Sequence, residues 1–249
     1  MKMAMFIVLA ALAIGSATKD KAFWEAKPYD SWSKKECEKV LMDSPWTARY
    51  VLGEYGVNTD RFGTDGGLGT ATRAEPTVIA GGERKIELKF FFSILSARPI
   101  RMALTRLSVL ENPGAVDSGT MKRNAEDPIP NVILVRIDYT ADPSGHPAIR
   151  DFELFFQQAL LGFFKTTYLA CGRTRVPIVQ YLKPGPQSPR PVFVFPRLDE
   201  SGRPFFAGRT DPLFLETRLD LRKTGGDRNY EMHLKFDLSK MRFAGEPEL

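Results

Sequence analysis

The chain has 249 residues, of which 43% are hydrophobic, and it carries a formal net charge of +5 at pH 7. A chain of this length forms one large domain or two small ones and can bury a sizeable core. The positive charge is weak and scattered along the sequence, so we expect no nucleic-acid partner.

The first 17 residues have the three parts of a secretory signal peptide. Lys2 precedes an apolar run from Ala4 to Ile14, and the small residues Gly15 and Ala17 stand where a signal peptidase cleaves. We therefore expect cleavage after Ala17 and a periplasmic or secreted protein with no remaining transmembrane span. An uncleaved N-terminal anchor is the alternative, although the run is shorter than the roughly 20 residues that span a membrane.

A short helix with both ends marked is predicted between Trp32 and Trp46. Ser33 and Glu36 have the spacing of a capping box, and Trp32 and Cys37 have the spacing of a hydrophobic staple. A proline ends the helix because it has no N–H group to donate. These residues are the structural anchor that we expect to dock this helix, as a lid, on the rest of the protein.

The next segment, residues 53–84, is predicted to be a long flexible loop. It includes the glycine-rich stretches 63–69 and 81–82. A phosphate-binding loop is the functional alternative, but the Gly-x-x-x-x-Gly-Lys-[Ser/Thr] pattern is missing from the segment.

A strand and a helix follow the loop directly. Hydrophobic residues alternate with others from Ile86 to Ile94, which predicts a strand with one buried face. Ser96 is expected to cap a helix that ends near Glu111. Three arginines are expected on the outer side of this helix, either as a solvated basic face or as an anion patch: Arg98, Arg101 and Arg106.

The second half of the chain is predicted to be rich in strands. Residues 112–131 form a polar connection, a strand covers 132–139, and the stretch 152–164 is apolar nearly all round, which predicts a buried helix. Short turns separate five further strands, which favours antiparallel pairing. These strands are Thr166–Cys171, Val176–Leu182, Pro191–Pro196, Leu213–Leu221 and Tyr230–Leu238.

Together these elements predict an α+β fold. A mostly antiparallel sheet packs against two helices, those that contain Ile100 and Phe152, and is accompanied by the docked N-terminal helix and the long glycine-rich loop. The predicted organisation is a signal peptide (1–17), a leader with the capped helix (18–52), the flexible loop (53–84) and an α+β domain (85–249).

Few residues suggest a reaction. His146 is predicted in a turn and His233 on the polar side of a strand, and neither belongs to a nucleophile motif. The sequence has no metal-ligand spacing and no cofactor motif, so we expect no metal and no cofactor. A carboxylate pair that acts as general acid and base is the enzymatic alternative, with Asp138, Glu153 and Asp237 as the residues to inspect.

Two further residue types leave alternatives open. Cys37 and Cys171 would meet an oxidising compartment, where either a disulfide or two separately buried thiols is allowed. Eighteen phenylalanines are enough to line an apolar pocket, but ordinary core packing is the expected role.

Several segments together resemble a family of secreted bacterial proteins of unknown function. They are Trp32–Glu36 with Ser44-Pro45-Trp46, the glycine-rich loop, the strand-to-helix passage 96–104 and the ending 235–241. The resemblance covers most of the mature chain and implies export and a single extracytoplasmic domain. It implies no activity and no catalytic residues.

The sequence therefore predicts an exported, non-enzymatic protein that binds a partner or has a structural role in the envelope. The expected partner is another protein or an envelope component. The alternative is an extracytoplasmic hydrolase that uses carboxylates.

Overall fold

A computed structural model describes residues 22–53, 87–114, 117–142, 144, 148–158, 162–186, 188–224 and 229–249. The predicted signal peptide, nearly all of the glycine-rich loop and His146 lie outside these residues. Across the described residues, no helix has both the length and the apolar character needed to cross a membrane.

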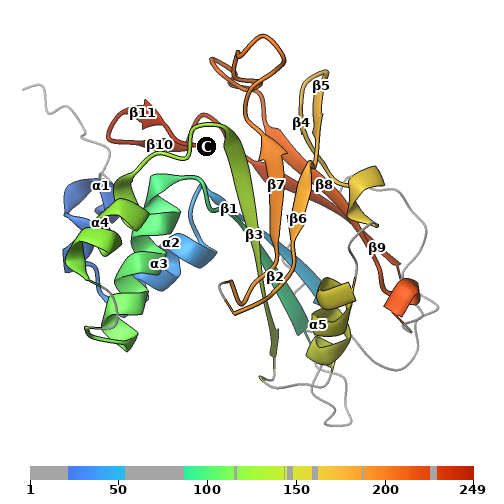
Figure 1. Ribbon diagram of the computed structural model, residues 1–249, viewed down its shortest axis with the longest axis horizontal. Coiled ribbons are helices and arrows are strands. Elements are labelled where there is room, and N and C mark those ends of the chain that lie inside the picture. The colour runs from blue at the N-terminus through green and yellow to red at the C-terminus, as the bar shows by residue number, and fades with distance from the viewer. Residues whose placement is uncertain are drawn as a thin grey trace, which may run out of the picture.

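Two antiparallel sheets form the body of the protein (Figure 1). The five-stranded sheet has the order β1 (Thr47–Gly53), β2 (Glu87–Ile94), β3 (Val132–Asp142), β7 (Val192–Pro196) and β6 (Gln180–Leu182). The four-stranded sheet has the order β5 (Thr174–Pro177), β4 (Tyr168–Cys171), β8 (Leu213–Asp220) and β9 (Asn229–Phe236). A third, two-stranded sheet consists of β10 (Arg242–Phe243) and β11 (Glu246–Pro247). The predicted α+β class is confirmed, but the strands form two main sheets rather than one.

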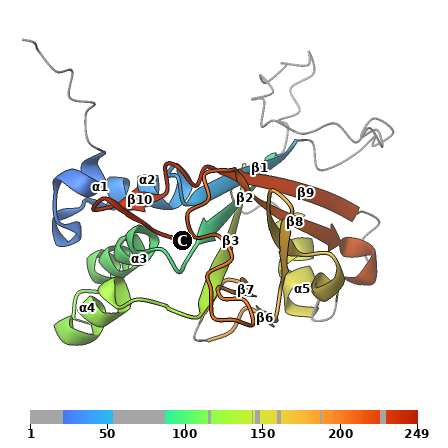
Figure 2. The same ribbon diagram turned by 90° about the horizontal axis from the view of Figure 1, so that it is seen from above.

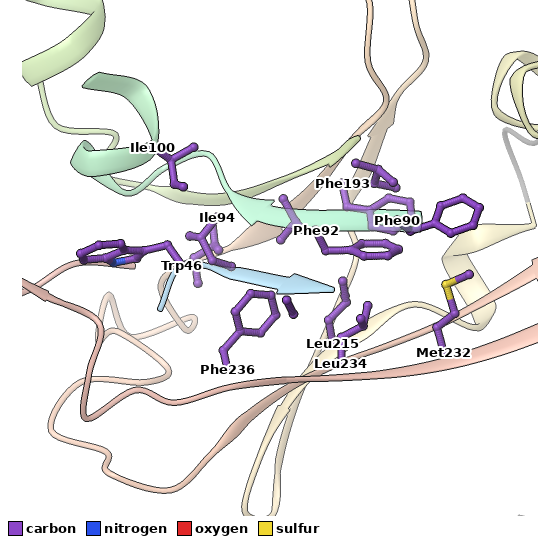
Figure 3. Close-up of a cluster of buried hydrophobic side chains, with 14 of the residues drawn as sticks. Trp46, Phe90, Phe92, Ile94, Ile100, Phe193, Leu215, Met232, Leu234 and Phe236 are labelled. Carbon is purple, nitrogen blue, oxygen red and sulfur yellow. The ribbon is translucent and has the colours of Figure 1, made fainter. Parts of the chain in front are cut away.

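The core lies between the two main sheets. Side chains alternate along each strand, so Phe90 and Phe92 of β2 point toward Leu215 of β8 and Leu234 of β9 (Figure 3). All four side chains are fully or almost fully buried. The phenylalanines, for which a pocket lining was the alternative role, mostly pack in this core.

The division into two sheets explains why the predicted strand 176–182 is broken. The chain leaves the four-stranded sheet after β5, where the Ile178 N–H donates to the carbonyl of Thr167 at 3.1 Å. At the next residue, the Val179 N–H donates to the carbonyl of Val194 on β7 at 2.8 Å. Residues 178 and 179 therefore carry the chain from one sheet to the other.

Helices cover the two ends of this body. One group contains α1 (Phe23–Ala26), α2 (Lys34–Met42), α3 (Arg98–Glu111) and α4 (Ser118–Glu126), with the 3-10 turn η1 (Tyr29–Ser31). The other end carries α5 (Ala148–Gln158) with the 3-10 turns η2 (Phe163–Lys165) and η3 (Leu221–Thr224). Figure 2 shows the same separation from above.

The predicted N-terminal block is present. The Ser33 hydroxyl accepts from the Glu36 N–H, and the Glu36 carboxylate accepts from the Ser33 N–H at 2.8 Å, which completes the capping box of α2. Trp32, Cys37 and Trp46 are buried. The strand β1, which was not predicted, starts directly after Trp46 and joins the block to the five-stranded sheet.

The Glu36 carboxylate makes the stability of this block dependent on pH. The Lys27 ammonium and the Ser33 donors lower the pKa of Glu36 from 4.5 to about 2. Because the folded-state pKa is depressed, the ionised carboxylate stabilises the fold above pH 4.5, and this contribution is lost as the pH falls toward 2.

We expect Glu36→Gln to remove that dependence. The melting temperatures of the wild type and the variant should differ most near neutral pH and converge as the pH falls toward 2. Thermal unfolding followed by circular dichroism across this range measures the difference. A constant gap at every pH would show that the charge of Glu36 has no part in the cap.

Three helix predictions were wrong in detail. Ser96 does not cap α3: Ala97 holds the N-cap position, and the Ser96 hydroxyl accepts from the Leu134 N–H at 3.3 Å. The polar connection contains α4, which Asp117 caps by accepting from the Thr120 N–H at 2.9 Å. The helix predicted in the stretch 152–164 is not buried on all sides, because Leu154 of α5 is 51% exposed.

The two cysteines are free thiols, and both are buried. Cys37 lies in α2 and Cys171 at the end of β4. Of the two arrangements that the sequence allowed, the structure has the separately buried thiols.

Candidate functional site

A shallow groove of about 320 Å³ lies on the outer face of the four-stranded sheet. Because Leu213 and Leu215 of β8 point into the core, the residues between and after them, Phe214 and Glu216, point outward. The groove is lined by Ala170, Gly172, Arg175, Asp211, Pro212, Phe214 and Glu216.

The chain forms one end of the groove by a tight turn between β4 and β5. Gly172 has a φ of +58° in this turn, a left-handed conformation that strains residues with a side chain. The side chains of Arg209 and Asp211 lie next to Gly172, and the Arg209 Nη2 donates to the Thr174 hydroxyl at 2.9 Å. Asp211 therefore lines this end of the groove, and Arg209 lies next to the turn.

Arg175 and Glu216 form a polar part of the groove lining, and Tyr168 lies beside Arg175. The Arg175 guanidinium lies 4.6 Å from the centroid of the Tyr168 ring and 3.6 Å from the Glu216 carboxylate. The Glu216 carboxylate, followed by burial, raises the pKa of Tyr168. The Tyr168 hydroxyl therefore stays protonated and remains a hydrogen-bond donor over a wider pH range.

These groups differ strongly in exposure. The Arg175 side chain is 65% exposed, whereas the Glu216 side chain is 19% exposed. Because most of the Arg175 side chain is exposed, its guanidinium is available to an incoming acceptor. The groove lining also has an apolar part, which consists of Ala170, Pro212 and Phe214.

The groove thus offers a cation, carboxylate oxygens and an apolar wall within one small volume. Its size is at the lower end of the roughly 300–1,000 Å³ that is usual for ligand sites. This arrangement suits the recognition of a polar group that also has an apolar side. His233 extends the same face, because it lies opposite Glu216 on β9 and is exposed, as predicted.

The three arginines of the predicted anion patch do not form a solvated basic face. Arg101 is only 7% exposed, and its Nη1 donates to the carbonyls of Asn124 and Asp127. Arg106 Nε donates to the carbonyl of Trp32 at 3.0 Å. The third, Arg98, forms an ion pair with the Glu248 carboxylate.

The three carboxylates inspected for acid and base chemistry have separate surroundings. Asp138 accepts from the Arg136 Nη2 at 2.8 Å and lies 3.3 Å from the Arg190 Nε. Glu153 is exposed on α5. Asp237 accepts from the Ser239 N–H at 3.1 Å in the turn after β9.

Asp138 and Glu153 do act on one common group, Tyr139. Burial raises the pKa of Tyr139, and the charges of both carboxylates act in the same direction. The Arg190 guanidinium lies 4.7 Å from the centroid of the Tyr139 ring. The ion pairs with Arg136 and Arg190 hold Asp138 in a network.

Within the described ranges, no group of three or more histidine, cysteine or acidic side chains is placed to hold a metal ion.

The sequence patterns singled out neither Tyr168 nor Arg175. Each residue sits on the outward side of a strand, which alternation alone shows. Their convergence depends on register: Tyr168 lies opposite Glu216, and Ala170 lies opposite both Arg175 and Phe214. A single sequence does not contain that register.

Comparison with known proteins identifies no relative of the chain. No family model, no curated protein and no solved structure matches the chain.

Proposed function

We propose that the protein is exported and acts as a binding protein, without catalysing a reaction, and that it holds a protein or another envelope component at the groove on its four-stranded sheet. The observation that carries the proposal is the combined polar and apolar lining of the groove, with Arg175 exposed at its rim. The N-terminal segment 1–17, with its pattern of a secretory signal peptide, supports export.

Photo-cross-linking from the wall of the groove tests the proposal for a partner of any chemical class. The substitution Phe214→p-benzoylphenylalanine keeps an aromatic ring on the wall and reacts with C–H bonds of any molecule bound there. We expect irradiation of cells that express the full chain to give a discrete adduct. The exported product, sequenced from its N-terminus, should begin near Thr18.

The matched control is Phe164→p-benzoylphenylalanine. Phe164 is 42% exposed in η2 and does not line the groove, so we expect no adduct from this position. Equal adducts from both positions, or none from Phe214, would count against the groove as the binding surface. Recovery of a full-length chain from the cytoplasm would contradict export.

A further inference from the structure

One row of side chains crosses all four strands of the four-stranded sheet at the groove. In register, this row contains Arg175 of β5, Ala170 of β4, Phe214 of β8 and Lys235 of β9. Side chains at paired positions of neighbouring strands lie on the same face of a sheet. Ala170 has the smallest of these side chains, so the surface is hollowed between the Phe214 ring and the Arg175 guanidinium. Lys235 is exposed on the far side of Phe214 and does not line the groove.

The formal charges around this hollow balance each other. The Arg175 guanidinium lies 3.6 Å from the Glu216 carboxylate. At the other end of the groove, the Arg209 Nη1 and the Asp211 Oδ2 lie 3.6 and 3.7 Å from the position that a Cβ of Gly172 would take. Two cations therefore lie beside two carboxylates. A ligand with a net charge of either sign would meet a like charge as well as an opposite one, which costs affinity.

The polar groups of the groove retain hydrogen-bonding capacity for a ligand. Most of the Arg175 side chain is exposed, and Asp211 is exposed as well. A guanidinium presents a fork of N–H donors, and a carboxylate presents a pair of acceptor oxygens. Because a hydroxyl group both donates and accepts, neighbouring hydroxyls on one ring can bond to both kinds of group. The polar part of the groove thus suits a ligand that is rich in hydroxyl groups.

The apolar part of the groove suits the C–H groups of the same kind of ligand. Phe214 is half-buried and lines the groove with Ala170 and Pro212. The face of an aromatic ring carries negative electrostatic potential, which attracts the weakly positive C–H bonds on one face of a sugar ring. A saccharide therefore combines the two features that the groove accommodates, an apolar face and a rim of hydroxyl groups.

A protein surface is a poorer match for this lining. The centre of a protein–protein interface is depleted of charged residues, and the side chains that dominate its affinity enter well-packed pockets. The groove is shallow, and three of its seven lining residues are charged, namely Arg175, Asp211 and Glu216. The lining therefore favours a saccharide over a polypeptide.

We propose that the ligand of the groove is an uncharged saccharide chain of the cell envelope. The apolar face of a sugar ring lies on Phe214 beside Ala170, and its hydroxyl groups bond to the charged side chains of the lining. The inference rests on the proposed function, because it names the ligand of the same groove.

The composition of the adduct from Phe214→p-benzoylphenylalanine tests the chemical class of the ligand. We expect acid hydrolysis of the purified adduct to release monosaccharides, and peptide mass spectrometry to find only the sequence of the protein itself. An adduct that contains a second polypeptide, or one that releases no sugar, would overturn the inference and leave the groove as the binding surface. The absence of any adduct would instead contradict the proposed function.

Co-sedimentation of the purified exported protein with envelope polysaccharide supplies an independent test. The probe is polysaccharide from the expressing cells after removal of protein, peptide and lipid. We expect the wild type to bind it with an affinity that stays nearly constant as the salt concentration rises, because an uncharged ligand has no charges to screen. No binding, or an affinity that falls steeply with salt, would overturn the inference.

The substitution Phe214→Leu should weaken this binding by at least about tenfold, because it removes the aromatic face and keeps an apolar side chain. The matched control is Phe164→Leu, the same change at a ring that is 42% exposed in η2, and it should bind as the wild type does. If Phe214→Leu does not fold, Asp211→Leu removes exposed acceptors of the lining and should weaken binding to a similar extent. Wild-type affinity in a folded variant of either lining residue would contradict the saccharide as ligand.

Discussion

The substitution Trp46→Ala is expected to lower the free energy of unfolding by about 3–5 kcal/mol, the range for truncation of a buried aromatic side chain. Trp46 is fully buried and lies beside Ile94 at the junction of the helices and the sheets (Figure 3). Its ring packs edge to face against Trp24 with 5.9 Å between centroids. The substitution leaves a cavity and also removes the indole donor to Glu248.

Urea unfolding followed by far-ultraviolet circular dichroism measures this loss without relying on tryptophan fluorescence. Trp46→Phe is the matched variant, because it retains an aromatic ring and removes the indole N–H. We expect a smaller loss for it, since most of the buried ring is kept. An unchanged unfolding midpoint in Trp46→Ala would show that the segment is an exposed motif rather than part of the core.

The N-terminal block was predictable because its interactions are local. The capping box joins Ser33 to Glu36 across one helical turn, so the spacing contains the whole signal. The strand β1 has a signal as well, since Ala48, Tyr50 and Leu52 alternate with more exposed residues. This strand of 7 residues was nevertheless not predicted.

The helix α4 shows where sequence patterns fail. Ala125 is its single buried residue, so it has no apolar stripe from which a helix is predicted. Its stability instead comes from the Asp117 cap at one end and from Arg101, which binds carbonyls near the other end. The helical wheel placed Arg101 outside, but α4 covers it.

Neither the groove nor the ion pair of Arg98 with Glu248 was predictable, and the reason is the same for both. Each depends on residues that meet only through tertiary structure: Arg175 reaches Glu216 across three strands, and Arg98 meets Glu248 across most of the chain. The residue types were visible in the sequence, but their partners were not. The alternation of side chains along a strand predicts which face each one occupies, but it does not predict which residues they contact.

The second large effect that we expect is weaker partner binding when the groove is filled or its charge is reversed. Ala170 lines its floor between Arg175 and Phe214, so Ala170→Trp places a large ring where the ligand would lie. Arg175→Glu attacks the same surface through charge, because it sets a second carboxylate beside Glu216. Each change should weaken binding of the captured partner by at least about tenfold, which corresponds to loss of one well-placed contact.

The matched control for the charge reversal is Arg49→Glu. Arg49 is exposed on β1 of the other main sheet, so the same change in net charge occurs away from the groove. Comparison of the three variants at equal ionic strength separates a local effect from general electrostatic attraction. Melting temperatures near that of the wild type would show that all three remain folded.

The most direct measurement of the central claim is the dissociation constant of the partner captured at Phe214, determined for the wild type, Ala170→Trp and Arg49→Glu. The groove as binding surface predicts tight binding by the wild type and by Arg49→Glu, with weak binding by Ala170→Trp. Equal dissociation constants for the wild type and a folded Ala170→Trp would contradict it.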